Sequence, residues 1–304
     1  SKSIEVKLGN SGEAMLGQFL KRDGRVVFQP VVPFSRGMHY HVLLAGIIIT
    51  EFDIPLNENA KTPELLIFPS TDTLPENILK MYLSFSEPMA EGKSIQYIFL
   101  VNSKGDTLDG TFLDLQPELW NDEGTVLTLW FDPGRIKRDL IPNKTMGNPI
   151  IKGNEYTLHV SGNWKSKSGK EIGIETMKKF RVTERDEKIP DVSTWTLNIP
   201  KGNTSGELIV HFPEPLDFSL IQSAIQILDS HGASIDGVLS PINEERGIRF
   251  KPLRTWKNGL CALKVESRLE DLAGNNLQRP FDRDITKGDG QQEKKYFEKK
   301  FRIE

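Results

Sequence analysis

Cysteine is nearly absent from this 304-residue sequence, which contains only Cys261. A single cysteine excludes an internal disulfide framework and a zinc cluster built on cysteine ligands. Long hydrophobic runs are also missing. The longest run, VLLAGIIIT at residues 42–50, has about half of the ~20 residues that a membrane-spanning helix needs. The sequence therefore predicts no transmembrane segment, and it predicts a buried strand at residues 42–50.

A dominant charge of one sign is absent as well. The chain has 39 basic and 42 acidic residues, which give a formal net charge of -3. Such a balance provides no overall field to attract nucleic acid or an anionic membrane, and we expect neither as a partner. With 37% hydrophobic and 27% charged residues, the composition is typical of a folded globular chain with two or three small cores.

Catalytic motifs are missing too. The sequence has no GxSxG, no phosphate-binding loop and no HExxH, which are local patterns of several large enzyme classes. Cys261 lies in the apolar strand pattern LCALKV, and we expect it to be an inert core residue rather than a nucleophile. We therefore expect no enzyme activity, no catalytic residue, no cofactor and no metal centre.

What the sequence does contain is a spacing of glycine and apolar residues that occurs three times. The copies are Gly105, Leu108, Gly110 and Phe112; Gly12, Met15, Gly17 and Phe19; and Gly232, Ile235, Gly237 and Leu239. Glycine supplies the positive φ that a tight hairpin needs, and alternating apolar residues bury one face of a strand. The spacing therefore predicts a repeat protein built from β-hairpins.

Further shared segments follow and precede these hairpins. Each copy continues to a Phe-x-Pro segment, at residues 28–30, 131–133 and 250–252, and then to a glycine that begins another strand. The second and third copies also have an upstream strand that the first lacks, with the pattern Phe-x-Glu-Pro-apolar, at residues 81–89 and 208–216. A complete copy has about seven strands, and helix is suspected only at residues 88–94. This pattern indicates antiparallel β-sandwiches.

Three local strings carry a resemblance to a known family. They are FSEPM at residues 85–89, GNEYTL at 153–158 and DLAGN at 271–275. Together with the hairpin spacing, they resemble the bacterial Ig-like module of SbsA type, which occurs in tandem in surface-layer and other exported proteins. The chain also resembles uncharacterised exported bacterial Ig-like proteins with a stretch like LTLWFDPGRIKR. The resemblance implies tandem Ig-like sandwiches and an exported location, and it supplies no catalytic residues.

The same comparison of copies predicts a domain map. Residues 1–61 are expected to form a partial or truncated Ig-like domain, residues 62–184 an Ig-like sandwich with two loop insertions, and residues 190–304 a further sandwich. Residues 178–182 and 299–303 have similar sequences, KKFRV and KKFRI, and are expected to be the last strands of their sandwiches. Residues 183–190 are a short charged linker, and the polar run 286–295 is predicted to be a loop.

The middle copy has insertions that the other two lack, and inserted loops on a rigid sandwich often form binding surfaces. A tryptophan near carboxylates and basic residues can bind a sugar or a peptide, because the ring stacks on apolar faces. The alternative, which we favour, is that Trp120 packs under its own loop and Arg135 ties the insertion down. The candidate binding residues are Glu118, Trp120, Arg135, Lys137, Arg138 and Trp164, and Trp164 is expected to be partly exposed.

Three further groups of residues could have an acid–base or metal-binding role, but a structural role is favoured for each. Glu87 and Glu214 occupy equivalent places in separate copies, so they are expected to lie a domain apart and to serve local turns. His39 and His41 form an HxH that points to one face of a strand, but a third ligand is not evident from the sequence. The DLAGNN segment at residues 271–276 offers oxygen atoms to calcium, yet its spacing favours a turn. Trp130, Trp195 and Trp256 are predicted to be core residues.

These observations favour a non-catalytic, extracytoplasmic multi-module protein with a structural, adhesive or partner-binding role. The alternative is a carbohydrate-binding module that uses the inserted loops of the middle copy. The expected partner is a cell-envelope protein or a polysaccharide. The expected location is the periplasm or the cell surface, with a lipid anchor as an option for a segment upstream of Ser1.

Overall fold

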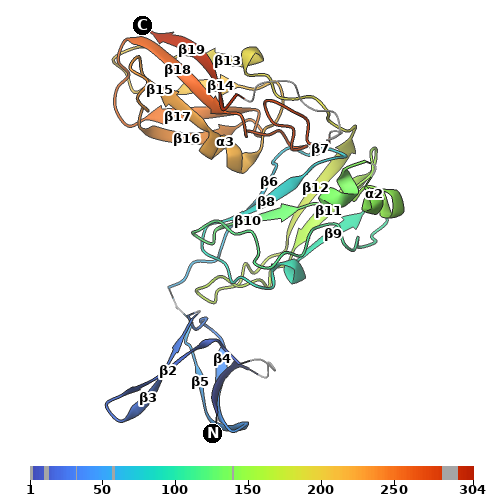
Figure 1. Ribbon diagram of the computed structural model, residues 1–304, viewed down its shortest axis with the longest axis vertical. Helices are drawn as coiled ribbons and strands as arrows, with labels where there is room; N and C mark the ends of the chain where they lie inside the picture. The colour runs from blue at the N-terminus through green and yellow to red at the C-terminus, as the bar shows by residue number, and fades with distance from the viewer. Residues whose placement is uncertain (1–2, 10–13, 32, 57–58, 139, 283–293) are drawn as a thin grey trace.

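The computed structural model describes residues 3–9, 14–31, 33–56, 59–138, 140–282 and 294–304. It shows three groups of β-strands that follow one another along an elongated molecule (Figure 1). The fold is all-β, with tandem Ig-like antiparallel β-sandwiches. The glycine at position 12 of the first hairpin and most of the polar run 286–295 lie outside the described residues.

The first repeat has two small sheets. A three-stranded sheet has the order β1-β4-β5, and a separate two-stranded sheet is formed by β2 and β3. The strands are β1 (Ile4–Leu8), β2 (Gly17–Arg22), β3 (Arg25–Pro30), β4 (His39–Leu44) and β5 (Ile47–Asp53). Few of their side chains are buried. Among the described hydrophobic residues of this repeat, Val6 and Tyr40 are the buried ones.

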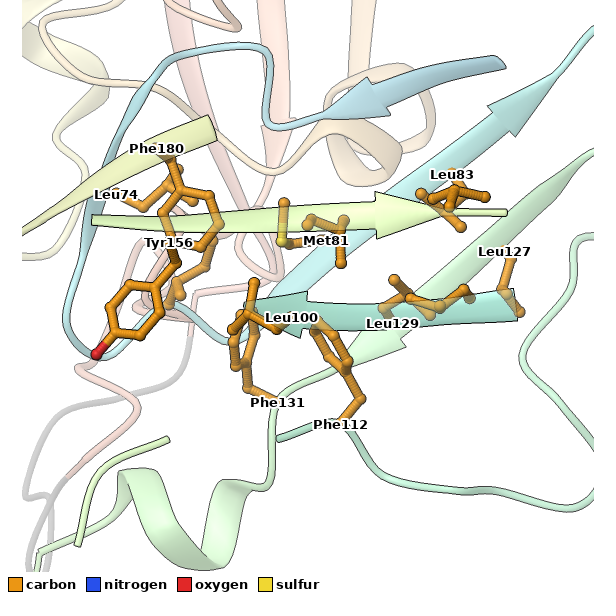
Figure 2. Close-up of a cluster of buried hydrophobic side chains, with 14 of the residues drawn as sticks. Leu74, Met81, Leu83, Leu100, Phe112, Leu127, Leu129, Phe131, Tyr156 and Phe180 are labelled. Atoms are coloured by element: carbon orange, nitrogen blue, oxygen red, sulfur yellow. The ribbon is translucent and has the colours of Figure 1, made fainter. Parts of the chain in front are cut away.

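The second repeat is a full sandwich. One sheet has the order β10-β8-β6 and the other β7-β12-β11-β9, with β7 parallel to β12. The strands are β6 (Leu65–Phe68), β7 (Thr73–Pro75), β8 (Lys80–Phe85), β9 (Ile98–Asn102), β10 (Val126–Trp130), β11 (Glu155–Val160) and β12 (Thr176–Thr183). Figure 2 shows the core between the sheets, where alternate residues such as Met81, Leu100 and Phe180 meet.

The third repeat has the same architecture. Its sheets have the orders β13-β14-β17-β16 and β15-β18-β19. The strands are β13 (Thr196–Asn198), β14 (Leu208–His211), β15 (Ile225–Leu228), β16 (Gly237–Ile242), β17 (Gly247–Pro252), β18 (Gly259–Glu266) and β19 (Tyr296–Ile303). A second core lies between these sheets and includes Trp195, Trp256 and Cys261, as the sequence predicts.

Short helices occupy several connections that the sequence pattern did not predict as helical. They are η1 (Ser94–Tyr97), α1 (Pro133–Ile136), α2 (Ile141–Met146), η2 (Val192–Thr194) and α3 (Phe218–Ala224). Local signals start some of them: Asp132 caps α1 ahead of a proline at the first position, and Asp217 caps α3 through the N–H groups of Ser219 and Leu220. Helices this short show no hydrophobic periodicity, so the 3.6-residue pattern does not predict them.

The three copies also share an equivalent backbone hydrogen bond. The N–H of Met15 donates to the carbonyl of Val6 at 2.7 Å. The equivalent bonds join Leu108 to Leu100 and Ile235 to Ile227, both at 2.8 Å. The apolar residue of each Gly-x-x-apolar copy is therefore bonded in the same way to the strand that precedes the turn. The domain boundaries at residues 61, 184 and 190 remain our proposal.

The second glycine of the hairpin is needed for close packing in the first and third repeats. In the first repeat, a Cβ atom added at Gly17 would lie 2.4 Å from the ring of Phe28. In the third repeat, a Cβ atom at Gly237 would lie 2.3 Å from the ring of Phe250. In these two repeats the phenylalanine of the Phe-x-Pro segment thus lies directly over the glycine of the partner strand.

The prediction of one buried strand at residues 42–50 is wrong. The run turns at Ala45 and Gly46, which have φ values of 51° and 81°, so its two halves form the hairpin β4–β5. Two consecutive residues with positive φ are what a tight hairpin turn requires. Ile47, Ile48 and Ile49 are exposed, because β5 is an edge strand of a repeat that has no large second sheet to cover it.

We expect Gly237→Ala to destabilise the third repeat by about 1–3 kcal/mol, because the added methyl group must displace the Phe250 ring from a filled core. Urea unfolding followed by circular dichroism measures the change. The control is Val238→Ala on the same strand, where the side chain is exposed and a change within about 0.5 kcal/mol is expected. Equal midpoints for the two variants would contradict the proposed packing.

Candidate functional site

The predicted aromatic platform in the middle repeat is packed rather than presented to solvent. Trp164 is 1% exposed, so the expectation that it is partly exposed is wrong. Its indole N–H donates to the carbonyl of Ala90 at 3.0 Å, and its ring stacks on Tyr97. Trp120 is half-buried and lies 5.8 Å from Trp164, measured between ring centroids. Trp164 belongs to the core of the second repeat, and Trp120 packs against that core.

Two charged residues of the predicted platform, Glu118 and Arg135, form hydrogen bonds within the second repeat. The Glu118 carboxylate accepts hydrogen bonds from Gly92, Ser94 and the Trp120 indole. Burial opposes ionisation of Glu118, but these donors outweigh it and hold its pKa below the ordinary value. Arg135 is buried and donates to the backbone carbonyls of Gly110, Gly147 and Asn148. It therefore ties down the insertion, through backbone carbonyl groups.

Lys137 and Arg138 point to the third repeat instead of to the tryptophans. The Lys137 ammonium lies 4.4 Å from the centroid of the Phe281 ring. Arg138 pairs with Asp282 at 3.0 Å and with Glu187 at 2.6 Å. The six residues predicted as a binding surface thus do not converge on one site. Ligand binding by these loops stays a prediction.

A buried convergence of charged side chains lies between the second and third repeats. Lys80 on β8 pairs with Asp217 at 3.3 Å and with Glu270 at 2.7 Å. The hydroxyl of Tyr82, two residues along the same strand, donates to Asp217 at 2.6 Å. Asp217 is buried, and a buried carboxylate is stable only when it is paired and hydrogen-bonded. The network therefore requires the two repeats to stay in contact.

Apolar and polar contacts surround this network. The rings of Phe68 and Phe218 are stacked across the joint, with centroids 3.8 Å apart and planes at 11°. The Ser70 hydroxyl and N–H both donate to the carboxylate of Glu245, at 2.8 and 2.7 Å. The linker also takes part, because the Asn77 side chain bonds both backbone groups of Asp186. We refer to these contacts, together with the Lys80–Asp217 network, as the joint.

A cleft of about 600 Å³ lies beside the joint. Asp186 from the linker, Glu214 after β14 and Asp271 at the start of the DLAGNN turn each place a carboxylate oxygen there, within 4.8 Å of the others. Arg246 and Lys188 also line the cleft. Burial and then the charge of Asp186 raise the pKa of Glu214 to about 7. Burial likewise raises the pKa of Asp271 well above its ordinary value.

The carboxylate of Asp271 is already occupied by its own turn. One oxygen accepts the N–H groups of Ala273 and Asn275, and the other accepts the Asn275 side-chain amide. These bonds agree with the turn that the sequence favours for this segment. Together with burial, the cleft therefore favours the protonated forms of Glu214 and Asp271, whose pKa values are raised.

Glu214 does not serve a local turn as we expected, because it faces the linker and the DLAGNN turn. Glu87 stays in its own repeat, 3.4 Å from the Ser168 hydroxyl. The two glutamates are thus apart, but only one of them faces other carboxyl groups.

A second candidate surface is the edge of β3 in the first repeat. In the third repeat, β17 lies between β16 and β14. In the first repeat, β3 pairs with β2, and no other strand among the described residues pairs with its opposite edge (Figure 1). The hairpin registers make Val26 equivalent to Ile248. Val26 is 58% exposed, whereas Ile248 is 0% exposed.

Comparisons with known proteins give distant similarities. No family model and no curated protein matches the chain. Among solved structures, part of the native alpha-2-macroglobulin from Escherichia coli is 11% identical, with a TM-score of 0.27 over 67% of this chain and 66% of that one. The N-terminal part of the bacterial S-layer protein SbsC is 13% identical, with a TM-score of 0.27 over 68% of this chain and 42% of that one.

The tandem Ig1-2 module of the Drosophila receptor protein tyrosine phosphatase DLAR is also similar, at 11% identity and a TM-score of 0.22 over 69% of this chain and 93% of that one. The chain thus spans less than two thirds of the first two structures. Within the described residues, no helix combines the length and the apolar character needed to cross a membrane.

We expect Tyr82→Phe to destabilise the chain by about 1–3 kcal/mol, because it removes a hydrogen bond to the buried Asp217 carboxylate. Urea unfolding followed by circular dichroism measures the loss. Tyr296→Phe is the matched control, since this tyrosine is largely exposed on β19. If both variants unfold at the wild-type midpoint, the buried network does not hold the joint.

Glu214→Gln tests the proton held in the cleft. In the folded chain the pKa of Glu214 is about 7, against an ordinary value of 4.5, so between these pH values only the folded state keeps the proton. Its stabilising contribution is therefore complete below about pH 4.5 and is lost as the pH rises to about 7. Thermal unfolding should show a smaller fall in Tm from pH 5 to pH 8 for the variant than for the wild type. Glu87→Gln, at the equivalent place in the second repeat, should follow the wild type.

Proposed function

We propose that this chain is a non-catalytic, extracytoplasmic multi-module protein that binds a partner polypeptide by strand addition to β3 of its first repeat. The second and third repeats form a stiff base for that contact, because the joint holds them through buried charges and stacked rings. The resemblance of the FSEPM, GNEYTL and DLAGN strings to exported Ig-like modules supports the extracytoplasmic location. A structural or adhesive role at the cell envelope follows from these properties.

The observation that carries the proposal is the edge of β3 that pairs with no strand in the part of the chain that the structure describes. An exposed strand edge presents a row of N–H and carbonyl groups that another strand can pair with. In the third repeat the equivalent edge, on β17, is paired with β14 over four residues, from Leu208↔Phe250 to His211↔Gly247. In the second repeat it is β10 that pairs with β8. The first repeat therefore has the acceptor strand of this pairing without the donor strand.

The two donor strands define the chemistry of the partner. On β8 and just after it, Met81, Leu83 and Phe85 are buried, and Glu87-Pro88 follows. On β14 and just after it, the same positions hold Leu208, Val210 and Phe212, all buried, and then Glu214-Pro215. The occupant of the β3 edge is thus an extended strand with apolar residues at alternate positions, followed by Glu-Pro. Main-chain bonds provide affinity in such strand addition, and alternate side chains provide specificity.

An aromatic cluster explains how the first repeat holds its shape while the edge is unoccupied. Phe34 lies 4.8 Å from Tyr40 and 5.3 Å from Phe52, as measured between ring centroids. Phe28 extends this cluster to the hairpin, 6.2 Å from Phe34 and 4.8 Å from Phe19. The cluster links the two small sheets, so β3 is positioned before a partner arrives. Pre-positioning of this kind lowers the entropic cost of binding.

The carbohydrate alternative has less support than strand addition. It requires an aromatic face in contact with solvent, whereas Trp164 is buried and Trp120 packs against it. Arg135 of the second inserted loop is also buried and bound to the backbone carbonyls of Gly110, Gly147 and Asn148.

Strand addition can be tested with a donor strand taken from the chain itself. A labelled peptide of residues 207–216, ELIVHFPEPL, should bind the full chain and change fluorescence anisotropy. Val26→Asp should weaken this binding at least about tenfold, because the charge would lie in the apolar contact. Val27→Asp is the matched control: it is the next residue and points to the other face, where β17 has the exposed Arg249.

Both valines are exposed in the described structure, so neither variant should unfold the repeat. Equal binding by both variants, or no binding of the peptide, would overturn strand addition. Light scattering at increasing protein concentration identifies the donor further. A dimer that Val26→Asp abolishes would show that a second copy of the chain supplies the strand, in place of a different polypeptide.

A further inference from the structure

We propose that His39, His41 and Glu51 bind one divalent transition-metal ion, with Zn²⁺ as the preferred ion. The HxH of the sequence supplied two imidazoles and no third ligand. The structure adds Glu51 from the neighbouring strand, and one donor atom from each of the three side chains lies within 4.8 Å of the others. Imidazole nitrogen and carboxylate oxygen are common zinc ligands, and three protein ligands leave a fourth position for water.

Strand pairing brings these residues together. His39 and His41 are two residues apart on β4, so their side chains leave the same face. On β5, Glu51 pairs in register with His41, and Asp53 pairs with His39. All four side chains therefore share one face of the β4–β5 hairpin, although 10 residues separate His41 from Glu51 in the sequence.

The distances match those that a tetrahedral ion requires. The Oε2 atom of Glu51 lies 3.4 Å from Nε2 of His39 and 3.6 Å from Nε2 of His41. Two ligands bound to zinc at about 2.0–2.2 Å with tetrahedral angles are about 3.4 Å apart. Only small side-chain rotations would be needed to place all three atoms around one ion.

Asp53 orients one of the ligands. The Nδ1 atom of His39 donates a hydrogen bond to Oδ1 of Asp53 at 2.8 Å. With the proton on Nδ1, the lone pair of Nε2 is directed to Glu51 and is available to a metal. A carboxylate behind a metal-binding imidazole is the usual arrangement, because it fixes the tautomer and the ring orientation. The His39–Asp53 pair thus has a role that a simple ion pair on the surface would not explain.

The surroundings admit an ion from solvent. The side chains of His39, His41 and Glu51 are 40%, 12% and 62% exposed. On the edge of β4 that faces away from β5, β1 places the basic residue Lys7 in register with His41. Its ammonium lies 3.4 Å from the Glu5 carboxylate, which offsets its charge. Zinc would link β4 to β5 in a repeat that has only a small buried core.

Isothermal titration of the full chain with ZnCl₂ tests this proposal. One ion per chain should bind, and the metal should raise the Tm of the wild type. His41→Ala and Glu51→Gln should each weaken binding at least about tenfold, and Asp53→Asn by about 10- to 100-fold. Glu51 is mostly exposed, so its variant is informative even if His41→Ala is poorly folded. His159→Ala is the control, because His159 contacts Glu175 at 3.0 Å elsewhere in the chain.

Cobalt supplies a second readout, since a tetrahedral Co²⁺ complex absorbs visible light and Zn²⁺ should displace it. Binding that persists in Glu51→Gln and His41→Ala, or that is lost equally in His159→Ala, would place the metal elsewhere and overturn the proposal. Absence of any stoichiometric binding to the wild type would overturn it as well. None of these results depends on whether β3 accepts a peptide strand.

Discussion

Pairing between the Phe-x-Glu-Pro strand and the Phe-x-Pro strand is the constraint on which the rest of the structure depends. Where the pair is present, as in β14 and β17, it closes one sheet of a sandwich and buries Ile248. Where the first member is missing, the same hairpin forms, yet Val26 remains exposed. One absent strand therefore accounts both for the small core of the first repeat and for the surface that we propose as its binding edge.

The loop after this strand also builds the joint. In the third repeat, β14 leads through Glu214 into the cleft and then to Asp217, which caps α3 and accepts from Lys80 and Tyr82 of the second repeat. A buried carboxylate that lost these partners would be costly, so the same residue stabilises the helix start and the contact between repeats.

The first repeat replaces buried aliphatic volume with two other kinds of interaction. Five aromatic rings connect its sheets, from Phe19 through Phe28 and Phe34 to Tyr40 and Phe52. On one face of β4 and β5, the histidines and Glu51 offer a place for an ion. Small domains with limited cores commonly depend on metals or partner chains, and the two proposals for this repeat are of those kinds.

The sequence by itself determined the all-β class, the three hairpins and the incomplete first copy, because glycine, proline and alternating apolar residues act locally. It also indicated that Trp195, Trp256 and Cys261 are core residues. Only the tertiary structure decided that Trp164 is buried and that the 42–50 run is a hairpin with exposed isoleucines. Only the tertiary structure shows that Glu214 lies near Asp186 and that Glu51 lies near His39 and His41. Those outcomes depend on strand register and on contacts between repeats, and neither is encoded in the spacing of nearby residues.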